Sequence, residues 1–187
     1  MPTFVLGGRP IRRSLARRRP QAARCRHQHP RARLAQQATA GGTNRRAAVN
    51  TVLARIDAFM AGATSTPADM AVLAVFLRAA AARHCVLGLV GTARVDAAER
   101  LWALATRRLP DPDRAHVAAQ LAFSANRRGD VVLASIALEA ALNSNPQHRF
   151  AQSLNTALEL GTSPLRLQAV VNYAYDIAAA LGLYLHR

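Results

Sequence analysis

Apolar side chains recur every three to four positions along most of the chain after Asn50, which is the spacing of amphipathic helices. The first such face runs from Val49 to Met60 and ends at Gly62. Glycine and proline separate the later faces, because glycine closes a helix and proline fits its first turn. The pattern predicts seven helices and no strand, with the helices at residues 49–61, 66–89, 95–109, 111–128, 130–144, 145–160 and 163–181.

Several of the expected helix starts combine a capping side chain with a proline at the next position, an arrangement that suits the first turn of a helix. These starts are Thr66-Pro67, Asp111-Pro112, Asn145-Pro146 and Ser163-Pro164, and Asp130 is expected to cap the helix that follows Gly129. Half of the residues are apolar but only 5% are aromatic, and the abundant alanine lets helices pack closely. We therefore expect residues 47–187 to form one all-α domain, a compact bundle of about seven helices.

Residues 115–148 resemble one 34-residue tetratricopeptide repeat, which is a hairpin of two helices. Leu121 and Ala122 take the large-small pair of its first helix. Ala134 takes the small position where the helices cross, and Leu138 takes the large apolar position. Only one repeat is recognisable, whereas solenoids need about three stacked units. The sequence therefore favours a repeat-like hairpin inside a compact bundle over a true repeat array.

Blocks in the second half of the chain also resemble a known family. They are Arg100–Pro112, Ala119–Asp130, Ala137–Pro146 and Leu154–Pro164. In this order they resemble the C-terminal helical part of an actinobacterial family known as domain of unknown function 4192, over roughly residues 70–165. The resemblance implies a cytoplasmic actinobacterial or phage-associated protein with no established activity. The resemblance also implies that family members are larger and have an α/β N-terminal half. Nothing before Asn50 matches such a half, so we expect this chain to be a truncated member.

The formal net charge of +15 is concentrated at the N-terminal end of the chain. The first acidic residue is Asp57, and thirteen arginines precede it. From Asp57 onward, twelve arginines stand against ten acids, so this larger part of the chain is nearly neutral. All the basic residues other than histidine are arginine. The basicity therefore belongs to the N-terminal segment and not to the helical domain.

Residues 1–46 are expected to form a disordered tail, because they combine arginine clusters, proline and the Gly41-Gly42 pair without apolar periodicity. Three interpretations stay open: an arm for nucleic acid or an anionic surface, a leader resembling a transit peptide, and translation from a start placed too far upstream. Binding of nucleic acid by such an arm would be non-specific, because arginines neutralise phosphates whatever the base sequence. The candidate contacts are Arg12, Arg13, Arg17, Arg18 and Arg19.

Three soft metal ligands lie close together in this tail, at Cys25, His27 and His29. Their alternate spacing and the lack of a second Cys/His pair argue against a closed tetrahedral zinc site. His84 and Cys85 could form a base and a nucleophile, but adjacent helical side chains point about 100° apart. We therefore expect no bound metal, no cofactor and no enzymatic activity.

The remaining carboxylates are too scattered for paired acid-base work. They are Asp57, Asp96, Glu99, Glu139, Glu159 and Asp176. No phosphate-binding loop, dinucleotide-binding fingerprint or metalloprotease signature occurs in the sequence.

The longest apolar stretch, residues 70–90, is interrupted by Arg78, Arg83 and His84. Such groups are costly at the middle of a bilayer, so we expect no membrane association. Two cysteines are too few for a disulfide framework, which favours a cytoplasmic location. The leading functional hypothesis is a non-enzymatic helical module that binds a protein partner or itself through its helix faces. The alternative is non-specific binding of nucleic acid through the arginine-rich tail.

Overall fold

The computed structural model describes residues 30–185 of the 187-residue chain, and within this range the protein is all-helical without a strand. This confirms the predicted fold class. The α-helices are α1 Pro30–Met60, α2 Pro67–Leu77, α3 Ala80–Leu87, α4 Val95–Arg108, α5 Asp113–Arg128, α6 Val131–Ser144, α7 Arg149–Glu159 and α8 Gln168–Ala180. Two 3-10 turns, η1 Gly88–Gly91 and η2 Pro164–Leu167, join α3 to α4 and α7 to α8.

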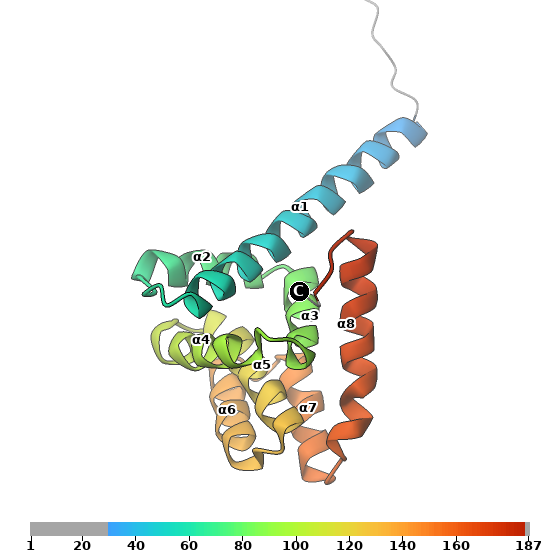
Figure 1. Ribbon diagram of the computed structural model, residues 1–187. Helices are drawn as coiled ribbons and strands as arrows, with labels where there is room; N and C mark the ends of the chain where they lie inside the picture. Colours follow the sequence, from blue (N-terminus) through green and yellow to red (C-terminus); the bar gives the residue numbers. More distant parts are fainter. Residues whose placement is uncertain (1–29, 186–187) are drawn as a thin grey trace, which may run out of the picture.

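Helix α5 lies at the centre of the bundle and packs along α4 on one side and α6 on the other (Figure 1). Helix α1 covers α2, α3 and α4, and its N-terminal part extends away from the other helices. Helix α8 packs against α3 at the other edge. Leu121, Leu138 and Leu154 are all buried, as the predicted apolar faces require.

Helix α1 begins at Pro30, well ahead of the predicted start of the helical domain at residue 47. The added part passes through Gly41 and Gly42. Residues 43–47 are exposed, so they carry no apolar stripe by which the sequence could have revealed a helix. The buried face starts only at Ala48 and Val49. The helix thus extends into the predicted tail, and residues 1–29 of that tail lie outside the described residues.

The single helix predicted for residues 66–89 is two helices, which corrects the expected number from seven to eight in the described part. The chain bends by 99° between α2 and α3, at Arg78 and Ala79. The guanidinium of Arg83 donates hydrogen bonds to the carbonyl oxygens of Leu77 and Arg78, at 2.8 and 2.6 Å. These bonds satisfy carbonyls at the end of α2 that the break leaves without helical partners. No glycine or proline marks this break in the sequence.

Two of the predicted helix caps are confirmed. Thr66 forms a capping box with Asp69 at the start of α2, because each side chain accepts a hydrogen bond from the backbone of the other residue. Asp130 caps α6 by accepting the amide hydrogen of Leu133 at 3.0 Å. Before it, Gly129 adopts a φ of 87°, a left-handed conformation that favours glycine. The turn between α5 and α6 is therefore fixed locally.

The other three predicted starts are wrong in detail. Helix α5 begins at Asp113, directly after Asp111-Pro112, and has no side-chain cap. The carboxylate of Asp111 instead pairs with Arg114. Asn145-Pro146 lies in a turn, and α7 is capped by His148. Ser163-Pro164 leads into the 3-10 turn η2 before α8. In each case, a tertiary contact or a turn places the helix start a few residues downstream of the local signal.

Helices α5 and α6 form the hairpin that the sequence predicts within residues 115–148. Both helices bury small side chains: Ala122 and Ala125 of α5 and Ala134 and Ala141 of α6 are fully buried. Small side chains allow the two backbones to approach, and Leu138 fills the adjoining space. The likeness to a tetratricopeptide repeat stays a prediction.

Candidate functional site

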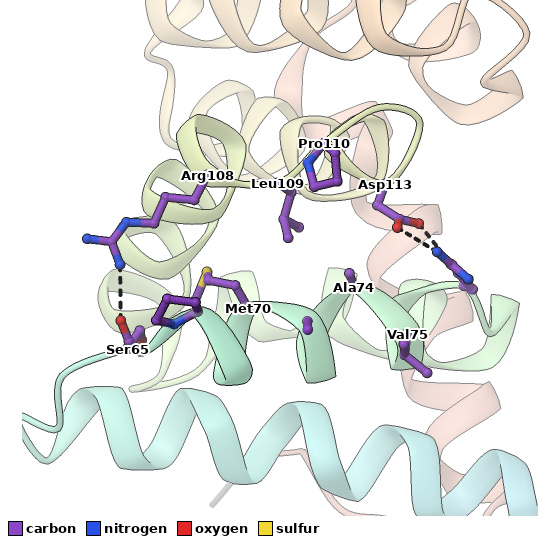
Figure 2. Close-up of a pocket in the computed structure, with 11 residues that line it drawn as sticks. Ser65, Met70, Ala74, Val75, Arg108, Leu109, Pro110 and Asp113 are labelled. Atoms are coloured by element: carbon purple, nitrogen blue, oxygen red, sulfur yellow. Dashed lines mark hydrogen bonds and ion pairs between the residues drawn. The ribbon is translucent and has the colours of Figure 1, made fainter.

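A cleft of about 750 Å³ lies between α2 and the segment that joins α4 to α5. Its floor is formed by Met70 and Ala74 of α2 and by Leu109, all nearly buried in the core. Figure 2 shows Met70 and Leu109 facing each other from the two sides of the cleft. Such a volume lies in the range of pockets that bind small molecules or single side chains of a ligand.

The walls of the cleft are apolar and open to solvent. Ala71 and Val75 of α2 and Pro110 of the joining segment line it and are exposed. The side chain of Val75 is 56% exposed, although a valine in a packed helix is ordinarily covered. Ala71 and Val75 therefore form an apolar surface of α2 that is largely open to solvent.

One end of the cleft carries Arg108, in the last turn of α4. Its guanidinium donates a hydrogen bond to the carbonyl oxygen of Ser65 at 3.0 Å, which links α4 to the loop before α2 (Figure 2). This bond uses one of the five donors of the guanidinium. Arg108 is exposed, so its positive charge stands at the mouth of the cleft.

The opposite end is closed by a bidentate pair between Arg78 and Asp113 (Figure 2). The two nitrogen-oxygen distances are 2.9 and 2.7 Å, and the pair joins the α2–α3 break to the first turn of α5. These hydrogen bonds hold the pKa of the Asp113 carboxyl below its ordinary value. Asp113 therefore stays ionised and compensates the charge of Arg78.

Behind this pair, two histidines join α5 to α7. Nδ1 of His116 and Nε2 of His148 lie 3.0 Å apart, and Nδ1 of His148 accepts the amide hydrogen of Ala151 at 3.2 Å. Both rings must be neutral for both bonds to exist, with the shared proton on Nε2 of His148. Burial, together with the charge of Arg83, lowers the pKa of His116 to about 4 and lowers that of His148. The pair is therefore a structural link at neutral pH.

The predicted candidate residues on α3 are not brought into a reactive pair. Cys85 is fully buried, and burial raises the pKa of its thiol to about 11, so the thiolate that nucleophilic chemistry needs is scarce. The ring of His84 instead packs edge-on against Tyr173 of α8. Both residues serve the packing of α3.

Of the candidate carboxylates, Asp96 and Glu99 line one hollow on α4 together with Arg100 and Arg128, and two of the six join helices. Asp57 of α1 pairs with Arg94, and Glu99 of α4 accepts hydrogen bonds from Ser124 and Arg128 of α5. Within residues 30–185, no group of three or more His, Cys, Asp or Glu side chains could hold a metal ion. The possible zinc ligands Cys25, His27 and His29 lie outside that range.

The predicted nucleic-acid contacts also lie outside the described residues, since Arg12, Arg13, Arg17, Arg18 and Arg19 all precede residue 30. Sequence reasoning missed the cleft altogether. Its two sides come from segments about forty positions apart, so no local motif joins them. The only local signal is that α2 is apolar on nearly all of its faces, which predicts burial and not an open wall.

Across the described residues, no single helix is long and apolar enough to cross a membrane. The pair formed by Pro67–Leu77 and Ala80–Gly91 reaches the required length and composition only when its two members are taken together, and they are bent by 99°.

Comparison with known proteins gives one match. A family model described as Domain of unknown function (DUF4192) matches residues 5–165. The match begins well before residue 70, so it includes the arginine-rich segment that the sequence analysis had left outside the resemblance. No curated protein matches the chain, and no solved structure does.

Proposed function

The chain belongs to the family with the domain of unknown function DUF4192, and from the structure of this member we propose that it is a non-enzymatic protein-interaction module. In this proposal, the cleft beside α2 receives apolar side chains from a segment of a partner polypeptide. The open apolar wall formed by Ala71 and Val75 is the observation that carries it. A free apolar surface next to a preformed cleft is typical of docking sites for peptide segments.

The distribution of polar groups supports a polypeptide ligand over a small metabolite. Sites for small polar molecules place several convergent polar groups around the ligand, which fix its orientation. Here the floor and walls consist of Met70, Ala71, Ala74, Val75, Leu109 and Pro110, and the charged residues stand at the two ends. Such a cleft selects for apolar bulk along its length, as when a segment is bound by a groove beside a helix.

The test selects random dodecapeptides displayed on phage against the full chain. Ala71→Trp fills the mouth of the cleft from an exposed position and leaves the core intact, whereas Ala68→Trp adds the same side chain to an exposed position of α2 outside the cleft. We expect the enriched peptides to bind the wild type and Ala68→Trp equally and to bind Ala71→Trp at least tenfold more weakly. Peptides that bind all three proteins equally would show that the cleft is not the docking site.

A second candidate function is non-specific binding of nucleic acid, which the uneven charge distribution favours. Thirteen arginines precede the first acid of the chain. An arm of this kind would neutralise phosphates and gain affinity by releasing counterions. The contacts proposed for it are Arg12, Arg13, Arg17, Arg18 and Arg19.

This alternative is tested on a 20-base-pair duplex DNA over a salt series. Arg17, Arg18 and Arg19 are replaced together by Gln, and the control replaces the exposed residues Arg107, Arg149 and Arg166, which removes the same charge. Each phosphate contact contributes ~0.9 to the slope of log affinity against log salt. We therefore expect the N-terminal triple variant, which loses three contacts, to reduce the size of this slope by about 3. Equal effects of the two triple variants, or no binding by the wild type, would exclude the arm as a nucleic-acid site.

We also propose that the protein acts in the cytoplasm. The thiol of Cys85 forms no disulfide within the described residues, which is consistent with a reducing compartment. Fractionation of cells producing the full chain tests this proposal, and recovery from the medium or the envelope would contradict it.

A further inference from the structure

The two ends of the cleft differ in charge, and from this difference we infer the chemistry of its occupant. We propose that the bound segment places an acidic side chain against Arg108 and its apolar side chains along α2. The inference rests on the proposed function and specifies both the partner, an acidic and apolar segment, and the direction in which it lies.

Arg108 supplies the positive end of the cleft. Its one hydrogen bond given by the structure goes to a carbonyl oxygen, that of Ser65, which is polar but uncharged. No ion pair among the described residues involves Arg108, so its charge is not compensated by the protein itself. A guanidinium with unused donors beside an apolar surface suits a carboxylate, which it can hold through two parallel hydrogen bonds.

Arg78 cannot play the same part at the other end. Both oxygens of Asp113 are engaged by its guanidinium, and the side chain of Asp113 is only 10% exposed. An incoming carboxylate would have to displace the carboxylate of Asp113 from Arg78 or lie next to its negative charge. The cleft is therefore close to neutral at the Arg78 end and positive at the Arg108 end.

The charge of the N-terminal segment acts in the same direction. Thirteen arginines and no acid precede Asp57, so this segment attracts an acidic partner over long range, whereas the part of the chain that forms the cleft is nearly neutral overall. The local charge at Arg108 then determines which end of the bound segment is acidic, while the long-range attraction affects mainly the rate of association.

The charge difference can be tested with two fluorescent dyes that share one ring system. The dye 1-anilinonaphthalene-8-sulfonate has an apolar body and an anionic group, and N-phenyl-1-naphthylamine is the same body without the anionic group. Their binding to the full chain is followed by fluorescence at low and at high salt. Arg108→Gln removes the charge at the cleft. Arg107→Gln removes the neighbouring exposed charge, which does not line the cleft, and serves as the matched control.

We expect Arg108→Gln to weaken binding of the sulfonate dye about fivefold, in line with an ion pair at a partly exposed site, and to leave the neutral dye unchanged. Arg107→Gln should change the affinity of neither dye by as much as twofold. Equal weakening of both dyes by Arg108→Gln, or equal effects of the two arginine variants on the sulfonate dye, would overturn the inference.

The Ala71→Trp variant separates this inference from the proposed function. If it weakens binding of both dyes while Arg108→Gln has no selective effect, the cleft binds apolar groups but the inferred acid at Arg108 is wrong. If Ala71→Trp leaves both dyes bound as tightly as Ala68→Trp does, the cleft is not the binding site and both proposals are wrong. Circular dichroism spectra of all four variants establish that each of them is folded.

Discussion

Helix α2 forms one side of the cleft, α5 contributes only Asp113 to one end of it, and the two helices use their side chains in opposite ways. In α5, twelve of sixteen residues are buried, including the polar residues Gln120 and Ser124. In α2, only four of eleven are buried, although nearly all of its residues are apolar. Composition alone therefore does not decide which helix is central. The position of a helix in the bundle decides it, and part of the apolar surface of α2 stays exposed to solvent.

The buried polar groups of α5 are stable there because the surrounding helices provide partners. The side-chain amide of Gln120 donates to the carbonyl oxygen of Arg83 at 2.9 Å, and the hydroxyl of Ser124 donates to Glu99 at 2.6 Å. Burying such groups without partners would be strongly unfavourable. In α2, by contrast, the apolar Val75 is 56% exposed to solvent. Substitutions in the two helices should therefore affect different properties of the protein.

The largest expected difference is in stability. Phe123 of α5 is 1% exposed, and its ring lies 5.9 Å from that of Phe150 in α7. We expect Phe123→Ala to lower the free energy of unfolding by about 3–5 kcal/mol, because it removes buried apolar surface and leaves a cavity. Val75→Ala should change it by less than about 0.5 kcal/mol, since the side chain is exposed. Urea unfolding followed by circular dichroism measures both, and similar losses would contradict the comparison.

The second prediction concerns acid. His116 and His148 are neutral in the folded protein, with the pKa of His116 at about 4, whereas the ordinary value in an unfolded chain is 6.5. Because the pKa values are lowered on folding, their contribution to stability is complete above about pH 6.5 and decreases as the pH falls toward 4. From the value for His116, we expect a loss of about 2 kcal/mol between pH 7 and pH 5.

The charged groups facing the pair are Arg83 of α3, Arg78 at the α2–α3 break and Asp113 of α5. The double variant His116→Gln, His148→Asn should have a flatter dependence of unfolding free energy on pH, because neither ring can then be protonated. His84→Gln leaves the pair in place and removes a ring whose pKa is also lowered, by burial and by Arg83, so it measures the contribution of that ring separately. A double variant that loses stability on acidification as steeply as the wild type would exclude the pair as the cause.

In α2, the group that responds to acid is a carboxyl and not an imidazole, and its contribution to stability is lost at lower pH. Hydrogen bonds from Thr66 hold the pKa of Asp69 below 3.8, its ordinary value. A carboxyl with a lowered pKa contributes stability that is present above that ordinary value and is lost only as the pH falls below it. Acidification from pH 7 to pH 5 should therefore weaken the contacts between α5 and α7 and leave the capping box of α2 unchanged.

The same contrast explains what the sequence could predict. The helical periodicity identified the buried faces around Leu121 and Leu138 and the turn at Gly129, because these depend on local spacing and backbone conformation. The break after α2 could not be predicted, since no glycine or proline marks it and the guanidinium that satisfies the freed carbonyl groups comes from Arg83, in the next helix.

The cleft could not be predicted for a related reason. Met70 and Leu109 come to line one cleft only when the bundle has assembled, and neither residue has a distinctive neighbour in the sequence. The histidine pair was missed in the same way, because His116 and His148 are 32 positions apart. Their only local signal is the position of His148 just before a helix, and the sequence analysis assigned that role to Asn145. Features built from two distant segments therefore needed the structure.

Smaller losses of stability than those expected for Phe123→Ala and for acidification come from replacing the two confirmed caps. Thr66→Ala and Asp130→Ala should each lower the free energy of unfolding by about 1 kcal/mol, because each leaves a backbone amide at a helix start without its acceptor. Thr66→Ser and Asp130→Asn keep an acceptor and should lose much less. The two alanine variants should differ in binding, because only α2 forms a wall of the cleft. We therefore expect Thr66→Ala to weaken binding of N-phenyl-1-naphthylamine while Asp130→Ala leaves it unchanged. Equal binding by both variants would mean that the start of α2 does not shape the cleft.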